Sequence, residues 1–143
     1  MSNIPDGLLY TKSHQWAKIE GDLVKVGITD HAQAQLGEIV YVELKWDDGL
    51  AGTALSQVAF DGDDPSSDPI EDVSVESQKA VGDIYSPLSG TVESVNEVLE
   101  DEPEKINEDP YGEGFLFFMK PSNLDGEKGN LLDAAGYKAF LGE

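Results

Sequence analysis

The chain has 143 residues, 39% of them hydrophobic, and a formal net charge of −20 from 29 acidic residues against nine lysines. A chain of this length and composition is expected to form one globular domain around one hydrophobic core. The charge argues against nucleic acid and anionic membrane surfaces as partners, because so few cations cannot neutralise a run of phosphates or lipid headgroups.

The chain has no cysteine. Disulfides, thiolate metal sites and cysteine nucleophiles are therefore excluded, and any redox-active sulfur must come from an attached group. No apolar run reaches the length of a transmembrane helix, and the first residues lack the basic and apolar regions of a secretory signal. Structured sequence is expected from Leu8, which leaves no room for a transit peptide, so we expect a cytoplasmic protein.

The first third of the chain is typical of antiparallel β-structure with tight turns. Alternating or β-branched segments predict four strands, at residues 8–12, 15–20, 23–28 and 38–44. A Gly-Asp pair at residues 21–22 suits a two-residue hairpin turn between the second and third strands. Thr29 or Asp30 can cap a short helix over residues 31–36, which Gly37 ends.

A looser segment follows at residues 45–72. It contains a turn at residues 46–49, a candidate strand at residues 53–60 and then an acidic loop with two prolines. Asp61 and Asp63 have the spacing of calcium ligands, but proline takes the next ligand position and serine replaces the glycine that such loops require. A solvated acidic loop is therefore favoured over a calcium site, and we expect residues 61–72 to be dispensable for folding.

Residues 73–90 predict a hairpin with a lysine at its tip. Valines alternate with polar residues until the pattern breaks at residues 78–80, and strand-forming residues then resume up to Pro87. Lys79 would stand at the turn between the two strands. A lysine held at a hairpin tip is easy for another protein to reach, although an ordinary solvated lysine is the default for any single position.

The last third predicts two more strands and a helix. Residues 91–96 alternate, residues 97–108 are acidic and rich in turns, and residues 109–114 form a compact turn before an apolar strand at residues 115–119. This strand is expected to be buried on both faces. Asn130 can cap a final helix whose apolar face would hold Leu131, Leu132, Ala135, Ala139 and Phe140.

Six segments in this order resemble the glycine cleavage system H proteins. They are LYTKSHQW (9–16), VGITD (26–30), LGEIVYVEL (36–44), VESQKA (75–80), DIYSPLSG (83–90) and NEDPYGEG (107–114). The resemblance implies a mainly β fold, a lipoyl-domain-like hybrid of barrel and sandwich with two antiparallel sheets, a short internal helix and a C-terminal helix. Residues 1–143 would form a single lipoyl-carrier domain with an acidic insertion around residues 61–72.

The resemblance also implies a cofactor and a function. The lysine that matches Lys79 carries covalently attached lipoic acid in this family. The protein would not be an enzyme but a shuttle, expected as a monomer. Its partners would be the pyridoxal-phosphate-dependent glycine decarboxylase (P protein), the folate-dependent aminomethyltransferase (T protein), the dihydrolipoyl dehydrogenase (L protein) and a lipoate ligase or lipoyl/octanoyl transferase.

Two features depart from the family pattern. Gln78 stands where the family usually has valine before the lysine, and the segment between Leu44 and Val75 is longer than usual. A loop insertion of this kind costs little free energy. These departures keep open a related role, in which an H-protein-like lipoate carrier serves sulfur oxidation or a lipoylation relay.

Three other functional interpretations have less support in the sequence. A hydrolytic triad would have to use His14 or His31, and the sequence has no Gly-x-Ser-x-Gly nucleophile motif. A biotin carrier would have methionines beside its lysine, whereas Gln78 and Ala80 flank Lys79 here. A purely structural relative with an unmodified Lys79 is the remaining alternative.

Overall fold

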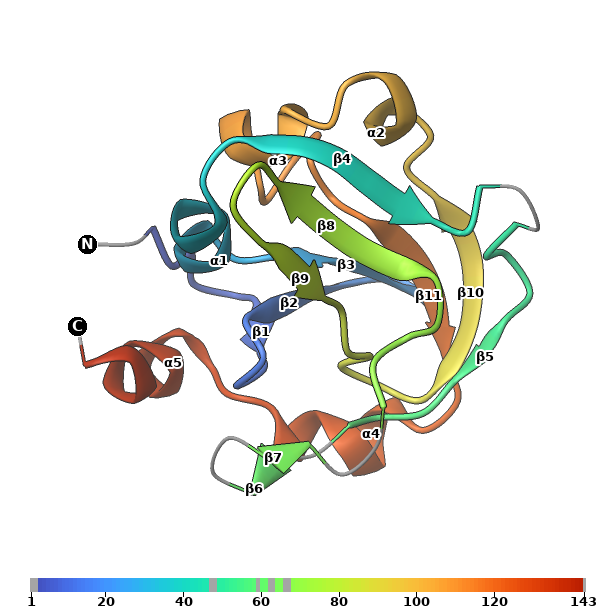
Figure 1. Ribbon diagram of the computed structural model, residues 1–143. Helices are drawn as coiled ribbons and strands as arrows, with labels where there is room; N and C mark the ends of the chain where they lie inside the picture. Colours follow the sequence, from blue (N-terminus) through green and yellow to red (C-terminus); the bar gives the residue numbers. More distant parts are fainter. Residues whose placement is uncertain (1–2, 47–48, 59, 62–63, 66–67, 143) are drawn as a thin grey trace.

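The computed structural model describes residues 3–46, 49–58, 60–61, 64–65 and 68–142, and shows a mainly β protein with short helices at its edges (Figure 1). All strand pairs in the described residues are antiparallel. Two main sheets face each other, which confirms the predicted fold class. No helix among the described residues is long and apolar enough to cross a membrane.

The larger sheet has six strands drawn from both ends of the chain. Their order across the sheet is β1 (Leu9–Tyr10), β2 (Gln15–Glu20), β3 (Leu23–Ile28), β11 (Phe117–Pro121), β10 (Gly90–Val95) and β5 (Ala54–Leu55). The β2–β3 hairpin turns at Gly21, whose φ of 64° suits a residue without a side chain. The two halves of the sheet meet where β3 pairs with β11.

The smaller sheet consists of β4 (Ile39–Leu44), β8 (Val73–Ser77) and β9 (Val81–Asp83). Its central strand, β8, alternates buried and half-buried residues, as the sequence predicts for a strand with one face on the core. The register of β4 against β8 shifts by one residue between Ile39 and Tyr41, which marks a bulge at Val40. A separate two-stranded ribbon pairs β6 (Phe60–Asp61) with β7 (Asp64–Pro65).

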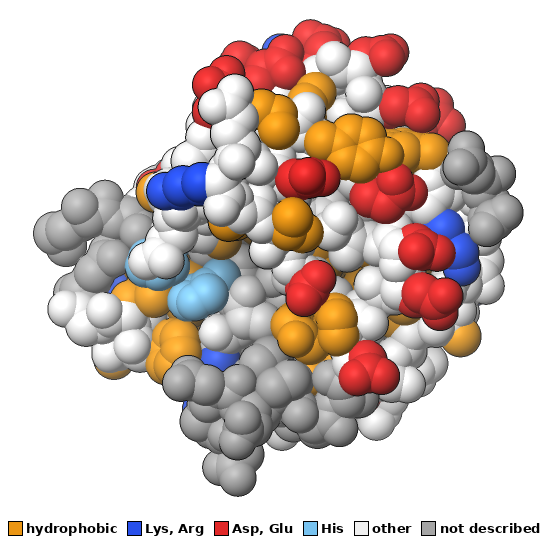
Figure 2. Space-filling model, viewed as in Figure 1, with side chains coloured by type: hydrophobic (Ala, Val, Ile, Leu, Met, Phe, Trp, Pro, Cys, Tyr) orange, Lys and Arg blue, Asp and Glu red, His pale blue; other side chains and the backbone are white. Residues whose placement is uncertain are grey.

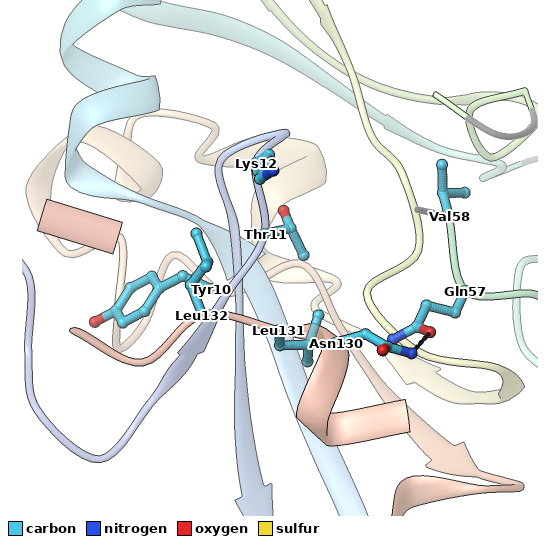
Figure 3. Close-up of a pocket in the computed structure, with 8 residues that line it drawn as sticks. All are labelled: Tyr10, Thr11, Lys12, Gln57, Val58, Asn130, Leu131 and Leu132. Atoms are coloured by element: carbon cyan, nitrogen blue, oxygen red, sulfur yellow. Dashed lines mark hydrogen bonds between the residues drawn. The ribbon is translucent and has the colours of Figure 1, made fainter. Parts of the chain in front are cut away.

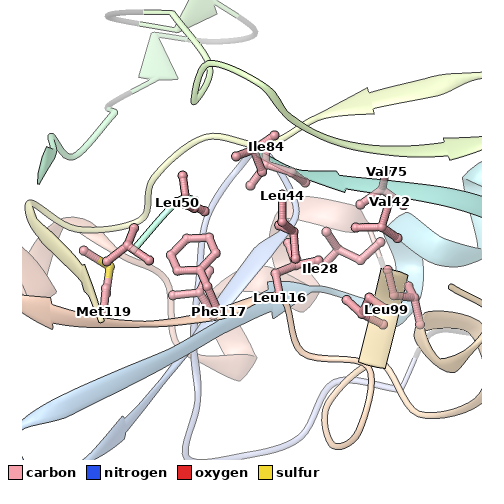
Figure 4. Packing of buried hydrophobic residues seen from close by; sticks show 14 of the residues in the cluster. Ile28, Val42, Leu44, Leu50, Val75, Ile84, Leu99, Leu116, Phe117 and Met119 are labelled. Atoms are coloured by element: carbon pink, nitrogen blue, oxygen red, sulfur yellow. The ribbon is translucent and has the colours of Figure 1, made fainter. Parts of the chain in front are cut away.

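The hydrophobic core fills the space between the two sheets (Figure 4). Both sheets contribute their inward-facing side chains, and the short helices α2 (Val98–Asp101) and α3 (Lys105–Glu108) close one end of the core. The labelled residues of this cluster are Ile28, Val42, Leu44, Leu50, Val75, Ile84, Leu99, Leu116, Phe117 and Met119. Because both sheets pack on the same core, the smaller sheet is a rigid support for the β8–β9 hairpin at its edge.

The described residues also form five short α-helices and one 3-10 turn, the last three of them after the final strand. They are α1 (Asp30–Leu36), α2 (Val98–Asp101), α3 (Lys105–Glu108), α4 (Leu124–Glu127), η1 (Lys128–Asn130) and α5 (Ala134–Leu141). The predicted helix after β3 is confirmed as α1, with Thr29 as its cap because Thr29 Oγ1 accepts a hydrogen bond from Ala32 N. Gly37 ends α1 with a φ of 87°.

Several predicted boundaries are wrong. The final helix begins at Ala134, because the Asp133 carboxylate, rather than Asn130, accepts the Gly136 amide in its first turn. The strand expected at residues 53–60 is replaced by β5 and by the first residue of β6, and the one after the lysine ends at Asp83 rather than near Pro87. Phe118 in β11 is half-buried, so this strand is not covered on both faces.

The long connection between β4 and β8 is tied to the body at both ends. Gln57 Nε2 donates to Pro87 O and Glu127 O at 3.0 and 3.1 Å, and Val58 N donates to Ser86 O at 3.2 Å. At the other end Ile70 packs against the core and its amide donates to Ile84 O at 2.8 Å. The last residues of the 61–72 segment therefore belong to the packed body.

Candidate functional site

Lys79 stands at the tip of the β8–β9 hairpin. Cross-strand pairs run from Ser74 and Asp83 up to Glu76 and Val81, and residues 78–80 make the connection. Lys79 is exposed, and none of the described residues forms a salt bridge with its amine. The structure thus places the lysine at the tip of a hairpin, where the sequence predicts it, with its side chain exposed.

Ser77 organises the backbone of this tip. Its amide donates to Ala80 O at 2.8 Å, and its Oγ accepts from the amides of Lys79 and Ala80 at 3.3 and 3.2 Å. The same hydroxyl donates to Ala80 O at 3.3 Å. Sequence reasoning missed this residue, although a serine two positions before a turn residue is able to bond the turn amides.

Asn107 builds the base under the tip. Its Oδ1 accepts from Ile39 N at 2.8 Å, while its Nδ2 donates to Gly37 O at 2.9 Å and to Gln33 Oε1 at 2.8 Å. These bonds join the end of α1 to the start of β4. The Lys79 side chain lies over this junction, since a Cβ added at Gly37 would stand 3.5 Å from Lys79 Cε. Asn107 was also missed, because its role depends on contacts far apart in the sequence.

A pocket of about 170 Å³ lies beside the hairpin, between β9, α1 and the loop before β2. Its apolar lining includes Ile28, Leu36, Val75 and Ile84. The hairpin touches α1 at this pocket, where a Cβ at Gly82 would stand 3.3 Å from Leu36 Cδ1. The pocket therefore begins next to the residue pair, Leu36 and Gly37, over which the lysine side chain lies.

His14 and His31 lie on the rim of this pocket, with ring centroids 4.8 Å apart. His14 Nδ1 is 2.7 Å from the Tyr137 hydroxyl, which is also 2.8 Å from Thr29 Oγ1 at the cap of α1. Burial lowers the pKa of His14 to about 4, and the neighbouring charge of His31 adds to this effect. His14 thus holds α5 against α1, which is a structural role rather than that of a catalytic base.

The outer side of the smaller sheet forms an acidic and apolar surface next to Lys79. Register places Tyr41, Glu76 and Val81 in one row across the three strands, with Glu43 and Asp83 in the next row. We call these five residues the hairpin face. Tyr41 and Val81 are 41% and 59% exposed, unusually high for large apolar side chains. Figure 2 shows apolar side chains surrounded by carboxylates on this side of the molecule.

A second pocket, of about 310 Å³, lies between the segments 10–12, 57–58 and 130–132 (Figure 3). A hydrogen bond of 3.0 Å from Asn130 Nδ2 to Gln57 Oε1 crosses its edge. None of its lining residues belongs to the hairpin, so this pocket is separate from the Lys79 site.

The described residues contain no cluster of three or more metal-ligating side chains that could hold an ion. The calcium-type spacing of Asp61 and Asp63 involves side chains that lie outside the described part of the chain. The sequence argument against calcium at this loop therefore stays a prediction.

Comparisons with known proteins identify relatives over the whole chain. The family model described as glycine cleavage H-protein matches residues 8–143. The glycine cleavage system H protein of Psychrobacter sp. (strain PRwf-1) is 48% identical over 142 residues, which covers 99% of this chain and 100% of the relative. That of Rubrobacter xylanophilus is 45% identical over 143 residues, covering 100% and 98% respectively.

A solved structure agrees with these sequences. The crystal structure of a glycine cleavage system H protein from Mycobacterium marinum superimposes with a TM-score of 0.78 at 34% identity, covering 98% of this chain and 100% of that one. The agreement in sequence and in fold extends from the N-terminal strands to the last helix. The chain therefore belongs to the glycine cleavage H-protein family.

Proposed function

We propose that this protein takes up a lipoyl group on the ε-amine of Lys79 and carries it between the enzymes of the glycine cleavage system. As a member of the H-protein family it is the carrier component of that system and not itself an enzyme. The observation that supports the choice of residue is the exposed position of Lys79 at the tip of a short hairpin on a firm base.

The chemistry of Lys79 fits a lipoyl attachment. Its primary amine is exposed and can be acylated, and the resulting amide is stable and uncharged. A bound lipoyl group supplies thiol–disulfide exchange and carriage of an aminomethyl unit, for which a chain without cysteine has no sulfur of its own. The hairpin leaves Lys79 exposed at its tip, so the chemistry can take place in the active sites of other proteins.

The apolar pocket beside the hairpin gives an arm on Lys79 a place to rest. It begins at Leu36 and Gly82, and Leu36 precedes the glycine that the lysine side chain covers. Apolar walls shield a hydrocarbon chain from water, and the polar groups on the rim can bond a charged end group. Gln35 and Asp83, both exposed, supply such polar groups.

The partners that we propose are those of the H-protein cycle. They are the glycine decarboxylase, the aminomethyltransferase, the dihydrolipoyl dehydrogenase and a lipoate ligase or lipoyl/octanoyl transferase. Each must approach Lys79 and therefore meets the hairpin face. Its carboxylates favour partner surfaces that present lysine or arginine around an apolar centre.

A lipoate carrier of the same fold in another pathway is not favoured. The curated relatives named above are glycine cleavage system H proteins and match this chain from end to end. Neither Gln78 nor the longer β4–β8 connection is associated with an altered site in the structure, because both leave Lys79 exposed at the tip.

Expression with a lipoate ligase and lipoic acid, followed by peptide mass spectrometry, tests the assignment. We expect a lipoyl mass shift on the peptide that contains Lys79 and on no other lysine. The loaded protein should then support glycine-dependent release of carbon dioxide by the decarboxylase, whereas the unloaded protein should not. A bare Lys79 would refute the site, and a lipoylated protein that the decarboxylase ignores would refute the pathway.

A further inference from the structure

At the hairpin tip, a side chain accepts hydrogen bonds from backbone amides. In the common short hairpin turns, the backbone conformation makes such a side chain unnecessary. Two-residue hairpin turns, and the common three-residue ones, place at least one residue at positive φ. Among the described residues, none between 78 and 80 has a positive φ, and none of the three is glycine. The connection at residues 78–80 therefore does not adopt the backbone conformation of the common short hairpin turns.

The Ser77 hydroxyl supplies the missing partner. It accepts from the amides of Lys79 and Ala80 at 3.3 and 3.2 Å and donates to Ala80 O at 3.3 Å. A hydroxyl has two lone pairs and one proton, so these three bonds use its full capacity. The amide of Lys79 itself is thus tied to a side chain two residues earlier.

Ser77 can hold the tip in one conformation because its own position is fixed by burial and by strand pairing. It is only 6% exposed and pairs in register with Ile39, which is 1% exposed. The Ile39 amide is held by Asn107 Oδ1 at 2.8 Å. A continuous set of contacts thus runs from Asn107 through Ile39 and Ser77 to the backbone of Lys79, while the lysine side chain stays exposed.

We propose that Ser77 is a positioning residue for acylation of Lys79. This inference rests on the proposed function, because it concerns the step that loads the lysine. In that step Lys79 Nζ attacks the carbonyl carbon of an acyl-adenylate. The N–C bond forms, the bond from that carbon to the phosphate oxygen breaks, the nucleotide leaves, and the amine proton passes to solvent. By holding the tip in one conformation, Ser77 presents the amine in the form that the loading enzyme binds.

The test compares acylation kinetics of three variants, with lipoyl-adenylate and a purified lipoate ligase. In Ser77→Ala the competent tip becomes a fraction of the population, which raises KM by the reciprocal of that fraction and leaves kcat unchanged. We expect a rise of about fivefold to tenfold in KM, because the three bonds lost with the hydroxyl are long, at 3.2 to 3.3 Å, and together contribute about as much as one ordinary hydrogen bond. Ser77→Thr restores the hydroxyl and should return KM toward the wild-type value.

Ser94→Ala is the matched control. Ser94 is an exposed serine on β10 of the larger sheet, away from the hairpin face, so its loss should leave KM unchanged. A purely structural role of Ser77 would instead lower the thermal midpoint and leave KM of the folded protein unaltered. Amide hydrogen exchange of the wild type gives an independent reading, with the Ala80 amide expected to exchange more slowly than that of Gln78.

The outcomes separate the two proposals. If wild-type Lys79 is acylated and Ser77→Ala has the wild-type KM, the positioning role is overturned and the proposed function stands. Rapid exchange of the Ala80 amide in the wild type also overturns the positioning role, whatever the variants do. If wild-type Lys79 is never acylated, the proposed function fails, and the positioning role fails with it.

Discussion

The side chain of Lys79 lies across the backbone of Gly37, with Cε at 3.5 Å and Nζ at 3.9 Å from the point where a Cβ of residue 37 would stand. The methylene stem thus rests on the end of α1, while the residue as a whole is exposed. The contact involves the aliphatic part of the side chain, which an arginine also has. A substitution can therefore remove the acylable amine without removing this packing.

Lys79→Arg should fold like the wild type and take up no lipoyl group. The guanidinium keeps its proton and is not acylated by the loading enzyme. Intact mass after expression with a lipoate ligase is the measurement, with the thermal midpoint as a check of the fold. Lys120→Arg, at an exposed lysine of β11, should be lipoylated normally. A lipoyl mass on the Lys79→Arg variant would show that another lysine is the attachment point.

Association with a partner enzyme should slow as salt rises. A net charge of −20 on a small domain steers a basic partner from a distance. The Debye length falls from about 30 Å at 0.01 M to about 3 Å at 1 M ionic strength, so steering fades over that range. Stopped-flow association rates with the decarboxylase measure this effect. Rates that do not depend on salt would contradict it.

The position of the charge should matter as well as its amount. Replacing Glu76 and Asp83 by Gln and Asn removes two charges from the hairpin face beside Lys79. The matched control replaces Glu20 and Asp22, two exposed acids at the β2–β3 turn, in the same way. We expect the first pair to lower the association rate more than the second. Equal effects would indicate that only net charge acts.

Stability should fall between pH 6.5 and pH 4 through His14. Burial lowers its folded-state pKa to about 4 from 6.5, so in this range the unfolded chain binds a proton that the folded protein does not. The stabilisation is fully present above pH 6.5 and is lost as pH falls. Because the side chain is only half-buried, we expect about 1–2 kcal/mol rather than the full value for such a shift.

A variant isolates this contribution from those of the many carboxylates. His14 has a φ of 69°, which asparagine tolerates, so His14→Asn avoids backbone strain. The difference in unfolding free energy between wild type and variant, measured by urea denaturation at several pH values, should shrink as pH falls from 6.5 to 4. A difference that stays constant would mean that His14 does not titrate in this way.

The acidic segment after β6 should be removable only in part. Replacing residues 61–68 with a short Gly-Ser linker should leave the thermal midpoint nearly unchanged. Extending the replacement to residue 72 removes the packing of Ile70 and the bond from Lys45 N to Asp72 O, 3.1 Å long. This longer replacement should lower the midpoint by at least about 4 °C. Equal midpoints for both variants would show that Ile70 contributes little.

Much of the fold follows from local sequence patterns. The strands β2, β3 and β4 and the helix α1 lie where alternation and capping predict them, because each buries a regular face. The helices α2 and α3 were missed since each has only four residues and buries one side chain, Leu99 or Ile106, which leaves no periodicity to detect. The pairing of β3 with β11 is invisible locally, as the two strands are far apart in sequence.

The candidate site also contains one part that the sequence predicts and another that it does not. A lysine at a break between two alternating segments can be recognised from the sequence, and the structure places Lys79 at that tip. The contributions of Ser77 and Asn107 arise from hydrogen bonds in the folded chain. Asn107 in particular contacts Ile39 across 68 positions of sequence, and no local pattern encodes such a contact.

The place of β11 in the larger sheet has a consequence for the order of events during synthesis. β11 joins β3 on one side to β10 on the other, so the sheet stays in two pieces until residues 117–121 are available. Lys79 leaves the ribosome earlier than β11 and earlier than Asn107, on which the base of the hairpin depends. An enzyme that reads the completed hairpin would therefore pass over unfinished chains. Loading would then be reserved for molecules whose translation has proceeded beyond β11.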